Sequence, residues 1–290
     1  MLTDRTVHPL AEGSVMAEWG PMRLSIASFV GKVPQREMNL AAAEEAFDCL
    51  ERVARLRKEL RKPLKNKSLL LKEPLGARML ESVHAIGDRN LTPMAAVAGT
   101  IADGVADFLF SRGLTKVIIN NGGDISVRLM APHSVWVGLR EDVNSEGFSS
   151  RIPLNVPPKK EGASFGVATS GLGGRSLTCG IASAATIIAN TASLADAAAT
   201  AVANASFVDH PGVVRRPAET MDTQTDIAGI PVTVQVQELD HKTRRNAISQ
   251  SLALAEELVK RGTILGAMVA VDGKIGMTSF FENHIITDIL

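Results

Sequence analysis

The chain has 290 residues, enough for one large domain or two modest ones and long enough to bury a core without disulfides or a structural metal. Its 31 Lys and Arg residues balance 31 Asp and Glu residues, so no net field attracts nucleic acid or an anionic membrane. No apolar run approaches the roughly 20 residues of a bilayer span, and no apolar signal segment follows residues 1–10. These features predict a soluble, cytoplasmic protein with neither a nucleic-acid nor a membrane partner.

Cysteine and histidine spacing excludes the common sequence-local metal sites. Cys49 and Cys179 lie far apart and form no C-x-x-C pair, and the six histidines show neither H-x-x-x-H nor H-E-x-x-H spacing. Tyrosine is absent and aromatic residues make up 4%, so surfaces for stacking single-stranded nucleic acid are poorly supplied.

The first third of the chain predicts a β-hairpin followed by helices. Alternating residues indicate strands over 14–19 and 23–30 around Gly20-Pro21. Apolar residues then recur at three and four positions over 35–60, which is typical of one long surface helix that Pro63 closes. A shorter helix is predicted over 75–85.

A helix with an unusually small first turn follows. Thr92-Pro93 is typical of an N-cap followed by proline at the first helical position, and the apolar pattern continues to Gly113. The segment Met94–Gly99 has little side-chain bulk on any face, so backbone or a ligand can approach closely there. Strands are then predicted over 116–120 and 125–129, on either side of the sharp turn Asn121–Asp124.

The remaining segments alternate between strands and helices with hairpin connections. Ser193 is interpreted as the N-cap of a helix over 194–206, and 207–226 as irregular. The other predicted elements are strands at 135–139, 151–155, 165–168, 182–189 and 230–236, a helix at 243–261, and a hairpin of 265–271 with 274–277. This order predicts an α+β fold with a central mixed or antiparallel sheet flanked by helices.

Three polar-tipped segments of small residues are candidate sites: 120–124, 169–171 and 195–200. The first is typical of a tight turn as well as of a ligand loop. The second, Thr169-Ser170-Gly171, is a candidate anion nest or an ordinary loop. Neither segment matches a Walker phosphate loop or a dinucleotide fingerprint.

Asp196 and Thr200 lie four residues apart on one helical face, where a carboxylate and a hydroxyl suit a hard cation such as Mg²⁺. The alternative is a variant capping box, in which Asp196 turns back to Ser193 and serves only the helix start. Asp103 and Asp107 have the same spacing, but they fall within an amphipathic helix, where a solvated face is the expectation.

The order of four motifs resembles the ApbE superfamily, the FAD:protein FMN transferases. These motifs are P-M-A-A-V-A-G from Pro93, N-N-G-G-D from Asn120, A-T-S-G from Ala168 and A-D-A-A-A-T from Ala195. They cover about 92–204. P-M-A-A-V-A-G and the Ser-Leu-x-x-Gly step after T-S-G resemble, in particular, a branch of ApbE-like hypothetical proteins of unassigned function.

The resemblance implies a single ApbE-like unit over 1–290 and a set of roles. Asp196 and Thr200 would bind Mg²⁺, which in the transferases bridges the FAD pyrophosphate. A flavin nucleotide would contact the turns and their neighbours, namely Asn121, Gly122, Gly123, Asp124, Thr169, Ser170, Gly171 and Arg175.

The sequence departs from the transferases after T-S-G. They carry an H-I-[IV]-D-P stretch there, whereas this chain passes from Arg175-Ser176-Leu177 directly into Cys179-Gly180-Ile181. Two hypotheses follow: an ApbE-like enzyme acting on a nucleotide or another phosphorylated, flavin-like ligand, and a non-catalytic binding protein that keeps the fold. A homodimer is left open.

Overall fold

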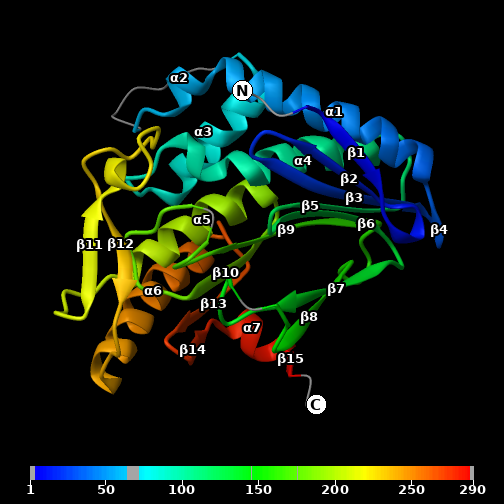
Figure 1. Cartoon of the computed structure of the whole chain (residues 1–290). Coiled ribbons are helices and arrows are strands. Elements are labelled where there is room, and N and C mark those ends of the chain that lie inside the picture. Colours follow the sequence, from blue (N-terminus) through cyan, green and yellow to red (C-terminus); the bar gives the residue numbers. More distant parts are fainter. Residues whose placement is uncertain (1–3, 64–71, 145, 175, 288–290) are drawn as a thin grey trace.

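The computed structural model describes residues 4–63, 72–144, 146–174 and 176–287 (Figure 1). Its main feature is a ten-stranded sheet in which every neighbouring pair is antiparallel. In spatial order the strands are β1 (Thr6–Pro9), β2 (Val15–Trp19), β3 (Met22–Val30), β5 (Lys116–Asn121), β6 (Asp124–Met130), β9 (Gly162–Ser170), β10 (Ala184–Ala189), β13 (Gly266–Val271) and β14 (Lys274–Met277), while β4 (Val33–Pro34) pairs with β3. The predicted α+β class is confirmed, and the sheet is antiparallel.

The longer helices cover one face of this sheet, whereas the short helix α7 (Ser279–His284) belongs to the other face (Figure 1). The helices of the described chain are α1 (Arg36–Arg55), α2 (Arg57–Leu60), α3 (Pro74–Ile86), α4 (Val97–Phe110), α5 (Ala192–Ala205), α6 (His241–Lys260) and α7. Helix α4 packs on β5 and β6, α5 on β9 and β10, and α6 on β13 and β14, with α4 and α5 in direct contact. The larger of two hydrophobic cores lies between these helices and the sheet.

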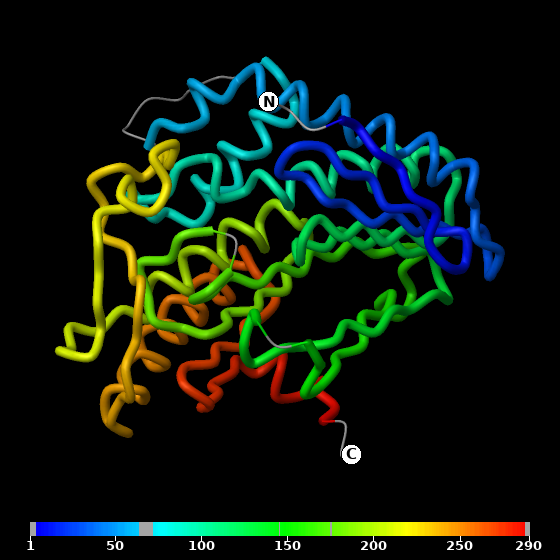
Figure 2. The backbone as a smooth tube through the Cα atoms, in the orientation of Figure 1, coloured from blue at the N-terminus to red at the C-terminus, as the bar shows by residue number. Residues whose placement is uncertain are grey.

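A smaller sheet lies on the opposite face of the main sheet, as the backbone trace shows (Figure 2). It consists of β7 (Ser134–Leu139), β8 (Ser150–Asn155) and β15 (Ile286–Thr287) in the order β15-β8-β7. Its inward-facing side chains, such as Val137 and Ile152, form a second core with Phe165 and Val167 of β9. A separate ribbon of β11 (Val213–Pro217) and β12 (Pro231–Val236) stands at the other end of the molecule.

The apolar segment Pro93–Phe110 is long enough to cross a membrane by length and composition, with a mean hydropathy of 1.3 over 18 residues. In the fold it comprises the 3-10 turn η2 (Pro93–Ala96) and α4, and α4 packs between α1, α5 and the sheet. Just over half of the segment is buried there, as is usual for a core helix of a globular fold.

Several predicted boundaries of helices are wrong. The helix predicted over 35–60 ends at Arg55, and the short helix α2 follows, in which Arg57 donates to Gln224 of a distant loop. Thr92 caps the next helix as predicted, but its first turn, η2, is 3-10 in form. The helical residues of α5 begin at Ala192, because its N-cap is Thr191 and not Ser193.

Elements that sequence periodicity did not predict are short and depend on distant partners. Strand β11 lies in the segment 207–226 that was predicted to be irregular, and it forms only by pairing with β12. Likewise β15 has two residues and pairs with β8, and β1 pairs with β2. Such strands carry too few residues to show a period of their own.

The contact between β9 and the start of α5 allows a stability prediction. A Cβ atom added at Gly166 would lie 2.0 Å from the carbonyl oxygen of Thr191, so Gly166→Ala forces the strand and the helix apart. We expect a loss of about 1–3 kcal/mol in the free energy of unfolding, as for other overpacked sites, measured by urea denaturation. Gly147→Ala is the control, since no atom lies within 4 Å of the added Cβ there; equal stability of the two variants would contradict the close contact.

Candidate functional site

Two of the sequence-predicted segments lie at the same end of neighbouring strands. Strand β6 begins at Asp124 and pairs with β9 in the register Ile125↔Val167, while β9 ends at Ser170. In an antiparallel pair the start of one strand lies beside the end of the other. The G-G-D turn and the T-S-G segment, about fifty residues apart in sequence, therefore meet at one edge of the sheet.

The G-G-D turn is a tight hairpin. Asn121 pairs with Asp124, and Gly122 and Gly123 connect them with φ angles of 69° and 116°. These left-handed angles favour glycine. The N–H of Gly123 also donates to the side-chain oxygen of Asn120 at 2.8 Å. The two glycines are thus explained by the turn, and the side chain that the turn presents is that of Asp124.

The T-S-G segment uses its polar groups within the fold. The hydroxyls of Thr169 and Thr186 lie 2.9 Å apart across β9 and β10. In the loop that follows, the N–H of Leu172 donates to the carbonyl of Ala182 at 2.8 Å, and that of Gly174 donates back to Gly171 at 3.2 Å. These two N–H groups are therefore not free to form an anion nest. The predicted site residue Arg175 lies outside the described residues.

Asp196 is held by a different helix from its own. One of its carboxylate oxygens, Oδ2, accepts a hydrogen bond from the N–H of Gly99, at 2.9 Å. The start of α5 is capped without it, because Thr191 accepts from the N–H of Leu194 and Asp103 accepts from the N–H of Ser193. The capping-box alternative for Asp196 is therefore wrong. Its role is to connect α5 to the small-residue segment that begins α4.

The same small residues let the two helices touch. A Cβ atom at Gly99 would lie 2.2 Å from the carbonyl oxygen of Ala192. The close approach predicted for the segment Met94–Gly99 is thus made by backbone. Thr200, one turn after Asp196, is half-buried, and its hydroxyl has no hydrogen-bond partner in the part of the chain that the structure describes.

Asp124 and Asp196 are electrostatically coupled, which brings together two segments that the sequence left separate. Burial raises the pKa of the Asp124 carboxyl to about 7. Burial, and then the negative charge of Asp124, raises the pKa of Asp196 well above its usual range, although the N–H groups of Gly99 and Ala98 act in the opposite direction. A buried carboxyl whose ionisation a second carboxyl opposes favours either its protonated form or a nearby cation.

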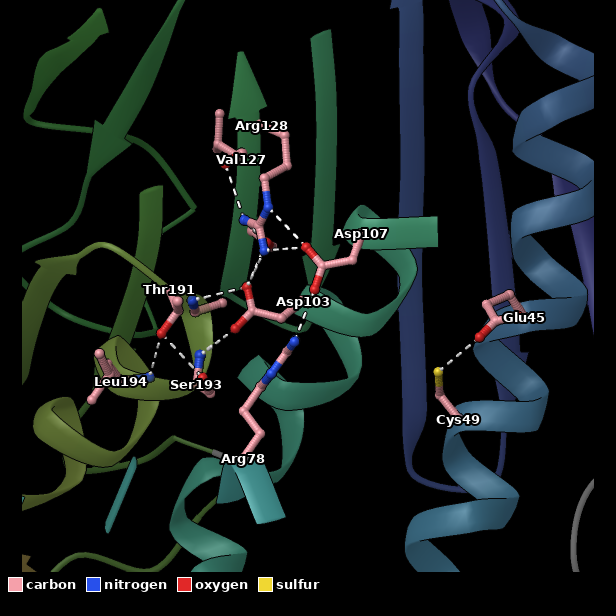
Figure 3. Close-up of polar contacts among 12 residues, drawn as sticks. Glu45, Cys49, Arg78, Asp103, Asp107, Val127, Arg128, Thr191, Ser193 and Leu194 are labelled. Atoms are coloured by element: carbon pink, nitrogen blue, oxygen red, sulfur yellow. Dashed lines mark hydrogen bonds and ion pairs between the residues drawn. The ribbon is translucent and has the colours of Figure 1, made fainter. Parts of the chain in front are cut away.

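A second acidic cluster next to this pair is structural. Asp103 is fully buried, and its carboxylate accepts from Ser126 at 2.7 Å, from Arg128 at 3.1 Å, and from the N–H groups of Ala192 and Ser193 at 3.1 and 3.0 Å (Figure 3). The expectation of a solvated face for Asp103 is therefore wrong, because a buried arginine and a helix N-terminus both need its charge.

Asp107, one turn further along α4, is 44% exposed. It binds the same Arg128 at 2.8 Å and Arg78 at 2.9 Å (Figure 3). Neither Asp103 nor Asp107 is thus available as a metal ligand without breaking an ion pair.

The polar residues that meet between β6 and α4 follow a pattern that is already visible in the sequence. In Asp124-Ile-Ser126-Val-Arg128 the polar residues alternate, so they share one face of β6. Thr100, Asp103 and Asp107 recur at helical spacing on α4, and Ser126 and Arg128 bind Asp103. A polar strand face opposite a polar helix face is unusual inside a core. That pairing was the available signal for a buried polar layer.

The comparisons with known proteins give the family. Residues 5–277 match the family model described as "AbpE bacteria". The chain belongs to this family.

Among curated relatives of this AbpE-family protein, a UPF0280 protein of Methanococcus vannielii is 33% identical over 147 residues, which cover 50% of this chain and 58% of the relative. A UPF0280 protein of Methanopyrus kandleri is 44% identical over 135 residues, 46% and 51% of the two chains. The matches thus span little more than half the length of these relatives. They agree with the resemblance to an ApbE-like branch of unassigned function.

A solved structure shares the fold. The ApbE protein of Thermotoga maritima aligns over 97% of this chain and 99% of its own, with a TM-score of 0.53 and 11% sequence identity. This supports the antiparallel α+β architecture of the AbpE-family chain and nothing finer.

The described residues contain no cluster of three or more His, Cys, Asp and Glu side chains that could hold a metal ion. Any cation at Asp124 and Asp196 would therefore need further oxygen ligands from a bound molecule. The two cysteines are unpaired, and burial together with Glu45 raises the pKa of Cys49 to about 12 (Figure 3), which leaves that thiol unreactive.

The buried ion pair yields a second stability prediction. Asp103→Asn leaves the nearly buried Arg128 guanidinium without its buried counter-charge, and we expect it to lower the free energy of unfolding by about 3–5 kcal/mol. Asp107→Asn removes the other, partly exposed partner and should cost about 1 kcal/mol or less. Guanidinium denaturation at pH 7 measures both. If the two variants lose equal stability, the buried pair does not hold the α5 N-terminus in place.

The raised pKa of Asp124 predicts a pH dependence. The folded state holds this proton more tightly than the unfolded chain, so the stabilisation is complete below about pH 4 and is lost as the pH rises through about 7. Because asparagine does not ionise, Asp124→Asn should not lose this stabilisation as the pH rises. We therefore expect the melting temperature of Asp124→Asn to match wild type at pH 4 and to exceed it increasingly towards pH 8.

The control for this titration is Asp209→Asn, at an exposed residue. Its melting temperature should follow that of wild type throughout. If the melting temperatures of Asp124→Asn and wild type change in parallel with pH, the pKa of Asp124 is not raised.

Proposed function

We propose that this protein binds a nucleotide or another phosphorylated ligand, together with Mg²⁺, beside the G-G-D turn and the first turn of α5. The observation that carries the proposal is that two buried carboxyls lie within electrostatic reach of each other, so that the charge of Asp124 raises the pKa of Asp196. The β5–β6 hairpin and the N–H of Gly99 hold these side chains in place.

Burial and the neighbouring carboxyl make ionisation of this pair costly, and pKa values perturbed in this way are typical of functional sites. A sequence under selection for stability alone would replace one aspartate by asparagine. A divalent cation removes the repulsion and converts the unfavourable pair into a binding energy.

Asp196 and Thr200, with Asp124 beside them, are the residues that would hold the ion. Oxygen ligands of this kind suit Mg²⁺, but they are fewer than the six it takes, so phosphate oxygens and water would complete the set. The ion would neutralise charge on the phosphate groups. The chain's own contribution is to fix the carboxylates on two rigid elements and to supply backbone N–H groups at the start of α4.

A flavin nucleotide is the first ligand to test, because the four motifs resemble those of FAD:protein FMN transferases. Two features favour a second candidate function, a non-catalytic ligand-binding protein. The H-I-[IV]-D-P stretch is missing, and the N–H groups of Leu172 and Gly174 are used within the chain. A cytoplasmic location and a homodimer stay predictions.

A thermal-shift experiment at pH 8 tests the proposal. The wild-type melting temperature should rise by several degrees when FAD or ADP is present together with Mg²⁺, and much less with either alone, because binding to the folded state adds RT ln(1 + [L]/Kd). Asp196→Asn should raise the melting temperature of the free protein by removing a charge, and should abolish the ligand-dependent shift. Thr200→Val should weaken the shift.

Asp209→Asn serves as the matched control and should keep the wild-type response. Absence of a Mg²⁺-dependent shift with either nucleotide in wild type would contradict the proposal. Chromatography of the same mixtures for AMP and FMN separates the two candidates: release of both from FAD supports an enzyme, whereas a shift without release supports a binding protein.

A further inference from the structure

A groove of about 570 Å³ lies on the face of the main sheet opposite α4 and α5. It runs along β8, the first half of β9 and helix α7, and its apolar lining includes Leu154, Phe165, Leu265 and Phe280. Strand side chains alternate between faces, so Phe165 points away from the helix-covered face where Ser126 and Asp103 meet. The groove is therefore separate from the proposed nucleotide site.

The ionisable groups of this groove are all basic. Lys160 and His284 line it, and no Asp or Glu does. Lys160 forms no ion pair with any described residue. The ring of His284 stacks on Phe280 with 4.7 Å between centroids, and its Nδ1 lies 2.7 Å from the Phe280 carbonyl oxygen. Nδ1 must therefore donate, which fixes the ring; Nε2 is then an acceptor in the neutral ring and a donor in the imidazolium.

We propose that this groove binds an amphipathic carboxylate, with the apolar body on the aromatic and aliphatic floor and the carboxylate at the Lys160 ammonium, where the imidazolium form of His284 would add a second donor. The volume falls within the range of small-molecule sites, and an apolar lining with a few polar groups is their usual composition. Charge complementarity selects the head group: a carboxylate pairs with the free ammonium of Lys160, a neutral alcohol gains no ion pair, and a quaternary ammonium is repelled.

The test uses anilinonaphthalene sulfonate, a fluorescent apolar anion, as the reporter and three ten-carbon competitors that share one tail. Decanoate should displace the reporter at a concentration about tenfold lower than decan-1-ol or decyltrimethylammonium, a difference that corresponds to one ion pair in a partly exposed site. Equal potency of the three competitors would overturn the assignment of a carboxylate site, and so would a complete absence of reporter binding.

Two variants locate the binding. Ala163 is half-buried, lines the groove and lies on the same face of β9 as Phe165, so Ala163→Trp should fill the groove and abolish reporter fluorescence while circular dichroism stays unchanged. Lys160→Glu, on the exposed rim, should remove the preference for decanoate over decan-1-ol without affecting folding. Lys274→Glu is the matched control, because Lys274 is an exposed lysine of β14 away from the groove.

If reporter binding and the decanoate preference persist in both groove variants, the ligand lies elsewhere on the protein and the proposal fails. A loss of the decanoate preference in Lys274→Glu as large as that in Lys160→Glu would also overturn it, since the effect would then reflect net charge alone. Because none of these residues belongs to the Asp124 and Asp196 site, the result is independent of nucleotide binding.

Discussion

The Asp103 carboxylate joins three elements at one buried point: its own helix α4, the sheet through Ser126 and Arg128 of β6, and the backbone N-terminus of α5. A buried charge is costly unless its partners surround it. Here a guanidinium, a hydroxyl and two N–H groups supply that compensation. The start of α5 is thereby fixed against α4, and Asp196 follows about one turn later, so the position of the candidate site depends on this contact.

Small residues make that junction possible. Gly99 and Gly166 each approach the first residues of α5 so closely that an added Cβ would overlap backbone. The helix can therefore lie near enough to both neighbours for Asp103 and Asp196 to reach across. Small side chains also explain how a chain with few aromatic residues packs a continuous core. Alanine-rich helices make fewer side-chain contacts, but their backbones can lie closer together.

The two faces of the sheet have opposite electrostatic character at their candidate sites. On the helix-covered face the buried carboxyls of Asp124 and Asp196 have raised pKa values, and a cation would favour their ionised forms. On the other face the groove of Phe165 carries the basic residues Lys160 and His284. Because alternate residues of one strand face opposite sides, β9 contributes to both environments without either constraining the other. The two proposed sites would thus select ligands of opposite sign, although the chain has no net charge.

The sequence by itself determined the elements with a clear period or a strong turn signal, including the β5–β6 hairpin, the capped start at Thr92 and the helix that carries Asp196 and Thr200. Motif order also gave the family. Only the tertiary structure decided that Asp103 is buried, that Thr191 replaces Ser193 as the cap, and that Asp196 accepts from the N–H of Gly99, within range of the charge of Asp124, instead of capping its own helix. Periodicity reports which face a residue occupies, whereas the burial and charge of a carboxylate depend on partners brought from distant parts of the chain.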